Sequence, residues 1–185
     1  MTASTKSPLV AEPVVDGRRL RSEVSRLRIV EAMIALVSEG LTMPPAEAVA
    51  ARAGVGLRTV FRLFEDMDGL YRGMQAVMTE RLGGLLEAPA DAADWREAIG
   101  ILIDRRAEAF EILLPLQIAA DSPRTRSAAL REGRRRLVQG QRDTLLAVLP
   151  AAIQADAELV QALDLALSFE AWRRLRTDQG AAIVQ

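Results

Sequence analysis

The feature that most constrains this chain is residues 51–64, which read ARAGVGLRTVFRLF. Two short runs with helical apolar spacing flank a turn that contains Gly54, and glycine readily adopts the left-handed backbone of a sharp turn. Two helices of about seven or eight residues joined by such a turn are typical of a helix-turn-helix. We therefore predict a second helix of the pair over Gly56–Leu63, with Val60 and Phe64 on its inward face.

The apolar residues before this segment repeat at intervals of three and four, which is typical of a helix that buries one stripe. The repeat predicts a helix that begins within Ser22–Ser25 and stops at Gly40, since glycine commonly follows a helix end. The Pro44–Pro45 pair begins the next helix, because proline is tolerated in a first turn. Residues 1–16 show no helical period, and we expect a disordered tail there.

Longer helices are predicted beyond residue 65. One covers residues 66–87, and a second covers residues 94–120 with a kink or an end at Pro115, because an internal proline removes a helix hydrogen bond. Ser122 and Pro123 are expected to cap and open a third helix that runs to Leu149.

A fourth long helix is expected over residues 156–180, with a stop at Gly180. The sequence thus predicts an all-α protein. Its expected parts are a three-helix helix-turn-helix DNA-binding domain at 17–65, with a basic N-terminal arm, and a helical-bundle regulatory domain at 66–185.

Cysteine and histidine are both absent from the sequence. Their absence excludes disulfides and thiolate zinc sites and removes the commonest general base. The sequence contains neither a phosphate-cradling glycine loop nor a metal-spaced acidic motif, so we expect no enzyme activity, no metal and no cofactor. It also contains no apolar run of about 18 residues and no secretion signal, so we expect a cytoplasmic protein without a membrane span.

The net charge of −1 conceals an uneven distribution. Residues 1–64 carry nine basic and six acidic side chains, whereas residues 65–185 carry fifteen basic and nineteen acidic ones. Five of the basic residues lie close together, at Arg18, Arg19, Arg21, Arg26 and Arg28. The N-terminal third is therefore the part suited to a polyanion, and the arginine run is expected to act as an arm along phosphates or in a minor groove.

On the second helix of the pair, the residues off the Val60 and Phe64 stripe face outward or sideways: Leu57, Arg58, Thr59, Phe61 and Arg62. Arginine can pair with guanine, an apolar side chain can contact a thymine methyl, and threonine can bond to a base or a phosphate. However, helix pairs of this kind are common in helical proteins, and exposed arginines are often simply solvated. The pattern leaves two functions open, DNA binding and an all-helical protein-interaction module that has lost specific DNA binding.

Residues 28–70 resemble the DNA-binding domain of the TetR family of transcriptional regulators. The matching positions keep their spacing and are Ile29, Ala32, Leu36, Glu39, Gly40, Val49, Ala50, Ala53, Gly54, Val55, Thr59, Phe61, Phe64 and Leu70. The long helices that follow are similar to the ligand-binding and dimerisation domain of that family. The resemblance implies a DNA-binding regulator, a repressor that a small-molecule effector releases from a double-stranded operator.

The sequence departs from the family pattern at four positions. Gly56 stands where the family usually has serine, Phe61 replaces its usual tyrosine, Leu63 a frequent histidine, and Met67 a common lysine. Together these changes remove two or three phosphate contacts. Each such contact contributes about one unit to the slope of the logarithm of the DNA-binding constant against the logarithm of the salt concentration. We expect the arginines to offset that loss.

The resemblance and the helix geometry together assign two sets of site residues. The predicted DNA-binding residues are Arg18, Arg19, Arg21, Pro45, Gly56, Leu57, Arg58, Thr59, Phe61 and Arg62. The predicted ligand-binding residues are Trp95, Ile99, Phe110, Leu113, Gln117 and Trp172.

A second basic run, REGRRR at residues 131–136, is interpreted as a solvated face. Family members pair as homodimers through two long final helices. In this sequence the first corresponds to residues 156–177 and the second is reduced to the few residues after Gly180. We expect a homodimer, and the short C-terminal end leaves three alternatives for the usual interface, which is smaller, rearranged or absent.

Overall fold

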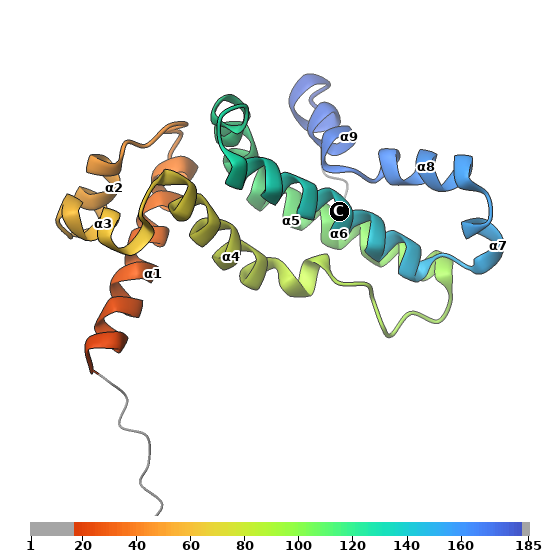
Figure 1. Cartoon of the computed structure of the whole chain (residues 1–185). Coiled ribbons are helices and arrows are strands. Elements are labelled where there is room, and N and C mark those ends of the chain that lie inside the picture. Colours follow the sequence, from red (N-terminus) through yellow and green to blue (C-terminus); the bar gives the residue numbers. More distant parts are fainter. Residues whose placement is uncertain (1–16, 183–185) are drawn as a thin grey trace, which may run out of the picture.

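The computed structural model describes residues 17–182, and the predicted tail at residues 1–16 lies outside them (Figure 1). Within residues 17–182 every regular element is a helix, which confirms the predicted all-α fold class. The order is α1 (Gly17–Ser38), α2 (Ala46–Ala53), α3 (Leu57–Phe64), α4 (Met67–Leu86), α5 (Trp95–Arg124), α6 (Ala128–Val148), α7 (Ala151–Gln154), α8 (Ala157–Ala166) and α9 (Phe169–Arg173), followed by a π-helical turn at Arg174–Asp178.

Helices α1, α2 and α3 form the helix-turn-helix unit, which we call the head. Gly40 ends α1 with φ of 98°, and Gly54 turns the chain between α2 and α3 with φ of 65°. The amide of Gly54 donates to carbonyls at the end of α2, so the turn also caps that helix. Val60 and Phe64 are only 2% and 3% exposed. The predicted turn and inward face of α3 are therefore confirmed.

Helix α1 begins at Gly17, earlier than the predicted start within Ser22–Ser25. The arginine run is accordingly part of the first turns of α1 rather than an arm before it. Two features of helical spacing explain the early start. Arg19 pairs with Glu23 one turn later at 3.2 Å, and apolar residues recur at positions 20, 24 and 27 on an exposed face. In Figure 1 these turns extend beyond α2 and α3.

Helices α4 to α9 form the body, in which α5 and α6 lie between α4 and the C-terminal helices (Figure 1). Helix α5 continues through Pro115 and Pro123 to Arg124, so the predicted helix start at Ser122 is wrong. The cap is instead Ser127, whose hydroxyl accepts from the amide of Leu130 at 3.1 Å and opens α6.

The last predicted helix, residues 156–180, is also broken in the structure. Helix α8 ends at Ala166, and Ser168 caps α9 by accepting from the amide of Ala171 at 3.2 Å. The Ser168 hydroxyl thus provides an acceptor for a backbone amide at the start of α9, so the chain can end one helix and begin another at this point. Gly180 lies in the left-handed region with φ of 66°, in agreement with the predicted stop.

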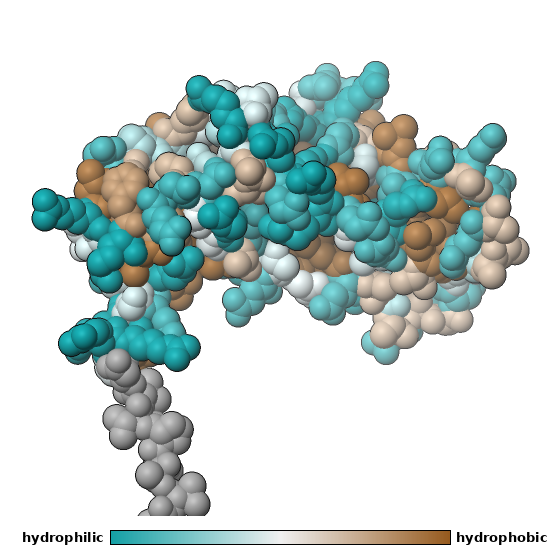
Figure 2. All heavy atoms as spheres, viewed as in Figure 1, coloured by the Kyte–Doolittle hydropathy of each residue, from teal (hydrophilic) through white to brown (hydrophobic). Residues whose placement is uncertain are grey.

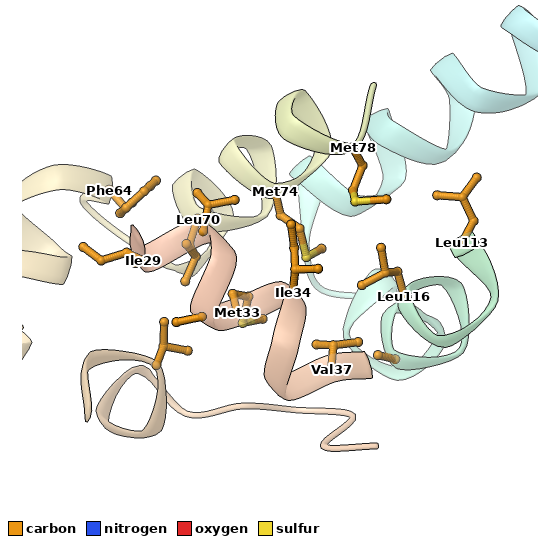
Figure 3. Close-up of a cluster of buried hydrophobic side chains, with 14 of the residues drawn as sticks. Ile29, Met33, Ile34, Val37, Phe64, Leu70, Met74, Met78, Leu113 and Leu116 are labelled. Atoms are coloured by element: carbon orange, nitrogen blue, oxygen red, sulfur yellow. The ribbon is translucent and has the colours of Figure 1, made fainter. Parts of the chain in front are cut away.

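One buried apolar cluster joins the head to the body. Figure 3 shows Ile29 and Phe64 of the head at one side of this cluster and Met78 and Leu113 of the body at the other, with Met74 between them. The five side chains are at most 7% exposed. Met78 of the body and the residues that hold α3 therefore belong to one continuous packed cluster.

Candidate nucleic-acid interface and ligand cavity

The exposed face of α3 is the candidate nucleic-acid interface. Arg58 and Arg62 are exposed, four residues apart, and Phe61 between them is 44% exposed. Within residues 17–182 neither arginine forms an ion pair or a hydrogen bond with another side chain. Thr59 and Leu57 are half-buried at the edge of the same face. The face therefore presents two solvated cations beside an aromatic ring.

The remaining predicted DNA-binding residues lie on other elements. Pro45 and Gly56 are exposed at the starts of α2 and α3, and neither gives a side-chain cap to its helix. Arg18, Arg19 and Arg21 are exposed in the first turns of α1. Figure 1 places those turns away from α3. The arginines of α1 therefore add a separate basic region to the candidate interface and do not lie on the same face as Arg58 and Arg62.

Two later arginines of α1 fix the position of α3. Arg26 donates from Nη1 to the carbonyl of Leu63 at 2.5 Å, and its guanidinium carbon lies 4.3 Å from the centroid of the Phe64 ring. Arg28 lies against the turn, since a Cβ on Gly54 would come within 3.3 Å of its Nη2. These two members of the arginine run therefore position the candidate interface.

The junction of α3 with α4 is a close backbone approach. A Cβ added to Gly69 would lie 2.0 Å from the carbonyl oxygen of Phe64, and one added to Gly73 would lie 2.9 Å from the Phe64 ring. The turn before α4 places Glu65 at φ of 64°, and the Asp66 carboxylate accepts from the amide of Gly69 at 2.7 Å. Only glycine fits at position 69, so α3 and α4 meet in one arrangement.

The first turn of α4 is also attached to the body. Asp68 accepts hydrogen bonds from the Ser127 hydroxyl at 2.5 Å and from the amide of Ala129 at 3.2 Å. The Ser127 hydroxyl, followed by the backbone amides at the start of α6, lowers the pKa of Asp68 below its ordinary value. The N-terminal turn of α4, which follows the head directly, is therefore bonded to the N-terminal turn of α6.

A cavity of about 440 Å³ lies between α4, α5 and α6. Its volume falls in the range of small-molecule sites, roughly 300–1,000 Å³. Two of its wall residues, Met74 and Met78, belong to the apolar cluster that reaches α3. A separate open groove follows α1 and α4 beside Phe64, and its lining includes Arg26 and Arg72.

Two of the six predicted ligand-binding residues, Leu113 and Gln117, line this cavity. Phe110 and Trp172 pack against each other with ring centroids 5.7 Å apart, in an aromatic cluster that does not line it. Trp95 and Ile99 pack against a second apolar cluster, under α8. Helical spacing alone does not distinguish such packing residues from a cavity wall.

The sequence interpretation missed the polar residues of the cavity. Its lining includes Arg106, Arg124, Arg134, Arg136 and Gln141. Two of these, Arg134 and Arg136, belong to the REGRRR run, so that run is only in part a solvated face. Arg134, Leu137 and Gln141 lie three and four residues apart on one face of α6, and this spacing was a signal in the sequence. Arg124, on α5, gave none.

In residues 17–182, His, Cys, Asp and Glu side chains do not gather in groups of three that would suit a metal ion. None of the helices in this part of the chain combines the length and apolar character that a bilayer crossing requires.

The geometry defines a class of protein. It is an all-α protein in which helix α4 joins a helix-turn-helix head to a helical body, and the body contains a cavity. Solved structures of the same fold include a protein of Pseudomonas aeruginosa PAO1 assigned as a transcriptional regulator. It has 20% sequence identity and a TM-score of 0.70, and the match covers 91% of this chain and 86% of that one.

Two further structures share the fold. The multidrug-binding protein EbrR, solved with imidazole, is 25% identical with a TM-score of 0.63, over 92% of this chain and 89% of its own. The protein SCO7518 of Streptomyces coelicolor A3(2), also assigned as a transcriptional regulator, is 24% identical with a TM-score of 0.55, over 83% and 98%. No family model and no curated protein matches the sequence.

Proposed function

We propose that this protein is a DNA-binding transcriptional regulator of the TetR type, a cytoplasmic homodimer that represses by binding a partly palindromic double-stranded operator until a small-molecule effector releases it. The observation that carries the proposal is the exposed pair Arg58 and Arg62 on a helix that α1 and α4 hold in place. The recognition helix of a helix-turn-helix needs such side chains off its core stripe.

Release by an effector is supported by the way the cavity is connected. Met74 and Met78 line the cavity and belong to the cluster that contains Phe64 of α3. A ligand that binds better to one arrangement of α4 than to another shifts the population toward that arrangement. In a dimer, such a shift changes the distance between the two heads. The two heads then no longer match the spacing of the two half-sites of the operator, and the dimer dissociates from the DNA.

Dimerisation is supported by apolar side chains that remain exposed on the C-terminal part of the body. Leu159, Leu165 and Leu175 are 42%, 68% and 46% exposed. Figure 2 shows brown patches over the end of the molecule where α7 and α8 lie. Apolar side chains that a single chain leaves exposed are candidates for burial against a second copy.

An electrophoretic mobility shift with the promoter region of the protein's own gene tests the proposal. We expect a sequence-specific complex at low salt that the double substitution Arg58→Ala plus Arg62→Ala abolishes. Arg135→Ala is the matched control, because Arg135 is an exposed arginine of the body. The absence of a specific complex, or one that survives the double substitution, would overturn the proposal.

Light scattering distinguishes the proposal from the alternative of an interaction module without specific DNA binding. The proposal requires a dimer that binds its operator in preference to unrelated DNA. A monomer with weak, sequence-independent retention of DNA would instead support the alternative.

A further inference from the structure

The cavity between α4, α5 and α6 has walls of two kinds. The apolar part comes from side chains on all three helices: Met74, Met78, Leu82, Leu113, Leu116 and Leu137. The charged side chains of the polar part are mostly cationic, with Arg106, Arg124, Arg134 and Arg136 against a single carboxylate, that of Asp143. The other polar side chains of the lining are uncharged: Gln75, Thr79, Gln117, Gln141 and Thr144. A ligand that fits both parts combines a hydrocarbon region with a group that accepts hydrogen bonds.

Three buried nitrogen atoms of this lining lack a hydrogen-bond partner within residues 17–182: Arg124 Nε, Arg134 Nη1 and Gln141 Nε2. Gln141 is only 5% exposed. All three atoms are donors, and a buried donor without a partner is costly. Each atom has less than 1 Å² of accessible surface, so a ligand acceptor reaches it once the side chain turns toward the cavity, and the unmet hydrogen bond favours that turn.

The charges around Arg134 add a second, independent observation. Arg124, Arg134 and Arg173 share two carboxylates, because Asp121 pairs with Arg124 at 3.0 Å and with Arg173 at 2.8 Å, and Glu170 pairs with Arg134. Burial, followed by the positive charge of Arg124, lowers the pKa of Arg134; Arg173 acts in the same direction and Asp121 opposes it. An unbalanced positive charge thus remains beside the cavity.

We propose that this cavity binds an amphipathic organic carboxylate, with its carboxylate at Arg124 and Arg134 and its hydrocarbon part against the methionine and leucine side chains. The inference deepens the proposed function, on which it rests, by naming the chemical class of the effector. A carboxylate accepts bonds from two guanidinium groups at once and neutralises the excess charge, which an alcohol of the same shape does not do.

Gln141 places a further requirement on the ligand. It follows Arg134 by seven residues on the cavity face of α6, two helical turns and about 10 Å along the axis. Its free Nε2 is therefore suited to a second acceptor, such as a hydroxyl or a carbonyl, at the far end of the hydrocarbon part.

Isothermal titration of the full chain without DNA tests the carboxylate, with decanoate, 1-decanol and decylamine as probes. We expect decanoate to bind at least roughly tenfold more tightly than 1-decanol, the gain from a charge-assisted pair. Decylamine is expected to bind least. Equal binding of decanoate and 1-decanol would overturn the proposal.

Substitutions test the assigned residues. Arg134→Met and, separately, Arg124→Met are each expected to remove most of the preference for decanoate over 1-decanol. Arg135→Met is the matched control, because the neighbouring Arg135 side chain is 74% exposed and does not line the cavity. Circular dichroism establishes which variants are folded. A preference that persists in both folded cavity variants, or that falls equally in the control, contradicts the assignment.

A third probe tests Gln141. We expect 10-hydroxydecanoate to bind more tightly than decanoate, and Gln141→Leu to remove that difference while it leaves the binding of decanoate unchanged. No advantage of the hydroxyl group, or one that survives Gln141→Leu, overturns the role of Gln141.

Gel shifts with and without decanoate separate this inference from the proposed function. A protein that prefers decanoate but binds no specific DNA supports the carboxylate site and refutes the regulator. A protein that binds its operator but does not distinguish decanoate from 1-decanol refutes the carboxylate site and supports the regulator.

Discussion

The carboxylate of Asp68 accepts a 2.5 Å hydrogen bond from the hydroxyl of Ser127, a residue 59 positions later in the chain. Asp68 lies in the first turn of α4, directly after the head, and Ser127 is the cap of α6. The same carboxylate also accepts from the amide of Ala129. These hydrogen bonds attach the first turn of α4, where the head meets the body, to the start of α6, one of the three helices around the cavity.

We predict that Asp68→Ala lowers the free energy of unfolding by about 1 kcal/mol at neutral pH, the usual value of a partly exposed hydrogen bond. The folded state lowers the pKa of Asp68. Its contribution is therefore complete above the pKa of an unfolded aspartate, about 3.9, and is lost as the pH falls through the lower folded pKa.

Urea unfolding of the wild type and Asp68→Ala at a series of pH values measures this difference. Asp104→Ala is a suitable control, because Asp104 is an exposed aspartate on α5. A difference between wild type and Asp68→Ala that stays constant down to the lowest pH would show that the ionised carboxylate is not what stabilises the junction.

The parts of the fold that the sequence predicts well are those that local chemistry determines. Gly54 allows the left-handed turn, and the spacing of Val60 and Phe64 fixes the inward face of α3. The helix ends that it predicts wrongly depend on distant contacts. Ser127 rather than Ser122 caps α6, and Asp68 accepts a bond from the hydroxyl of that cap.

The candidate sites divide in the same way. Arg58 and Arg62 could be placed outward from the stripe of their own helix. The cavity depends on the packing of three helices, and the sequence does not distinguish a wall residue such as Leu113 from a packing residue such as Phe110. The sequence indicates a solvated charge at Arg134, because the contact of its guanidinium with Glu170 joins α6 to α9 and depends on the tertiary fold.

The glycines of α4 give a prediction with a control in the same helix. Gly69→Ala would place its Cβ 2.0 Å from the Phe64 carbonyl oxygen, whereas a Cβ on Gly84 meets nothing within 4 Å. We expect Gly69→Ala to destabilise the protein by roughly 2 kcal/mol or more, and Gly84→Ala to stabilise it by up to about 1 kcal/mol. Urea unfolding provides both values. Equal effects of the two substitutions would refute the close approach of α3 to α4.

The arginines of the head are predicted to divide into two groups by the salt dependence of DNA binding. Arg26 bonds to the Leu63 carbonyl and lies over Phe64, so Arg26→Met is expected to lower the free energy of unfolding by about 1 kcal/mol. It should weaken DNA binding without a change in the salt slope.

The exposed pair should behave in the opposite way. The single substitutions Arg58→Ala and Arg62→Ala, which each leave one arginine to bind the operator, are each expected to reduce the slope of log K against log salt by about one unit and to leave the unfolding free energy nearly unchanged. Fluorescence anisotropy with labelled operator DNA measures both slopes. A reduced slope for Arg26→Met would mean that Arg26 contacts phosphate instead of holding α3.

The last prediction concerns Arg106, a guanidinium that is only 3% exposed. It donates to the carbonyls of Leu167, at the break between α8 and α9, and of Gln141, and to the Thr144 hydroxyl at 2.9 Å. Burial lowers the pKa of Arg106, and the negative charge of Asp164 opposes this shift.

Arg106→Met keeps the apolar stem but removes the donor to the Leu167 carbonyl and one of the donors to the Gln141 carbonyl, which also accepts from the Thr144 hydroxyl at 3.0 Å. We expect it to lower the free energy of unfolding by about 3 kcal/mol. Arg105→Met is the matched control, because Arg105 makes no such bond to the described residues. Since Arg106 joins α5 to the α8–α9 break, the loss should also remove amide protection around Leu167 in hydrogen exchange. A variant that loses stability but keeps that protection would show that the guanidinium stabilises α6 alone, and that Ser168 suffices to break the final helix.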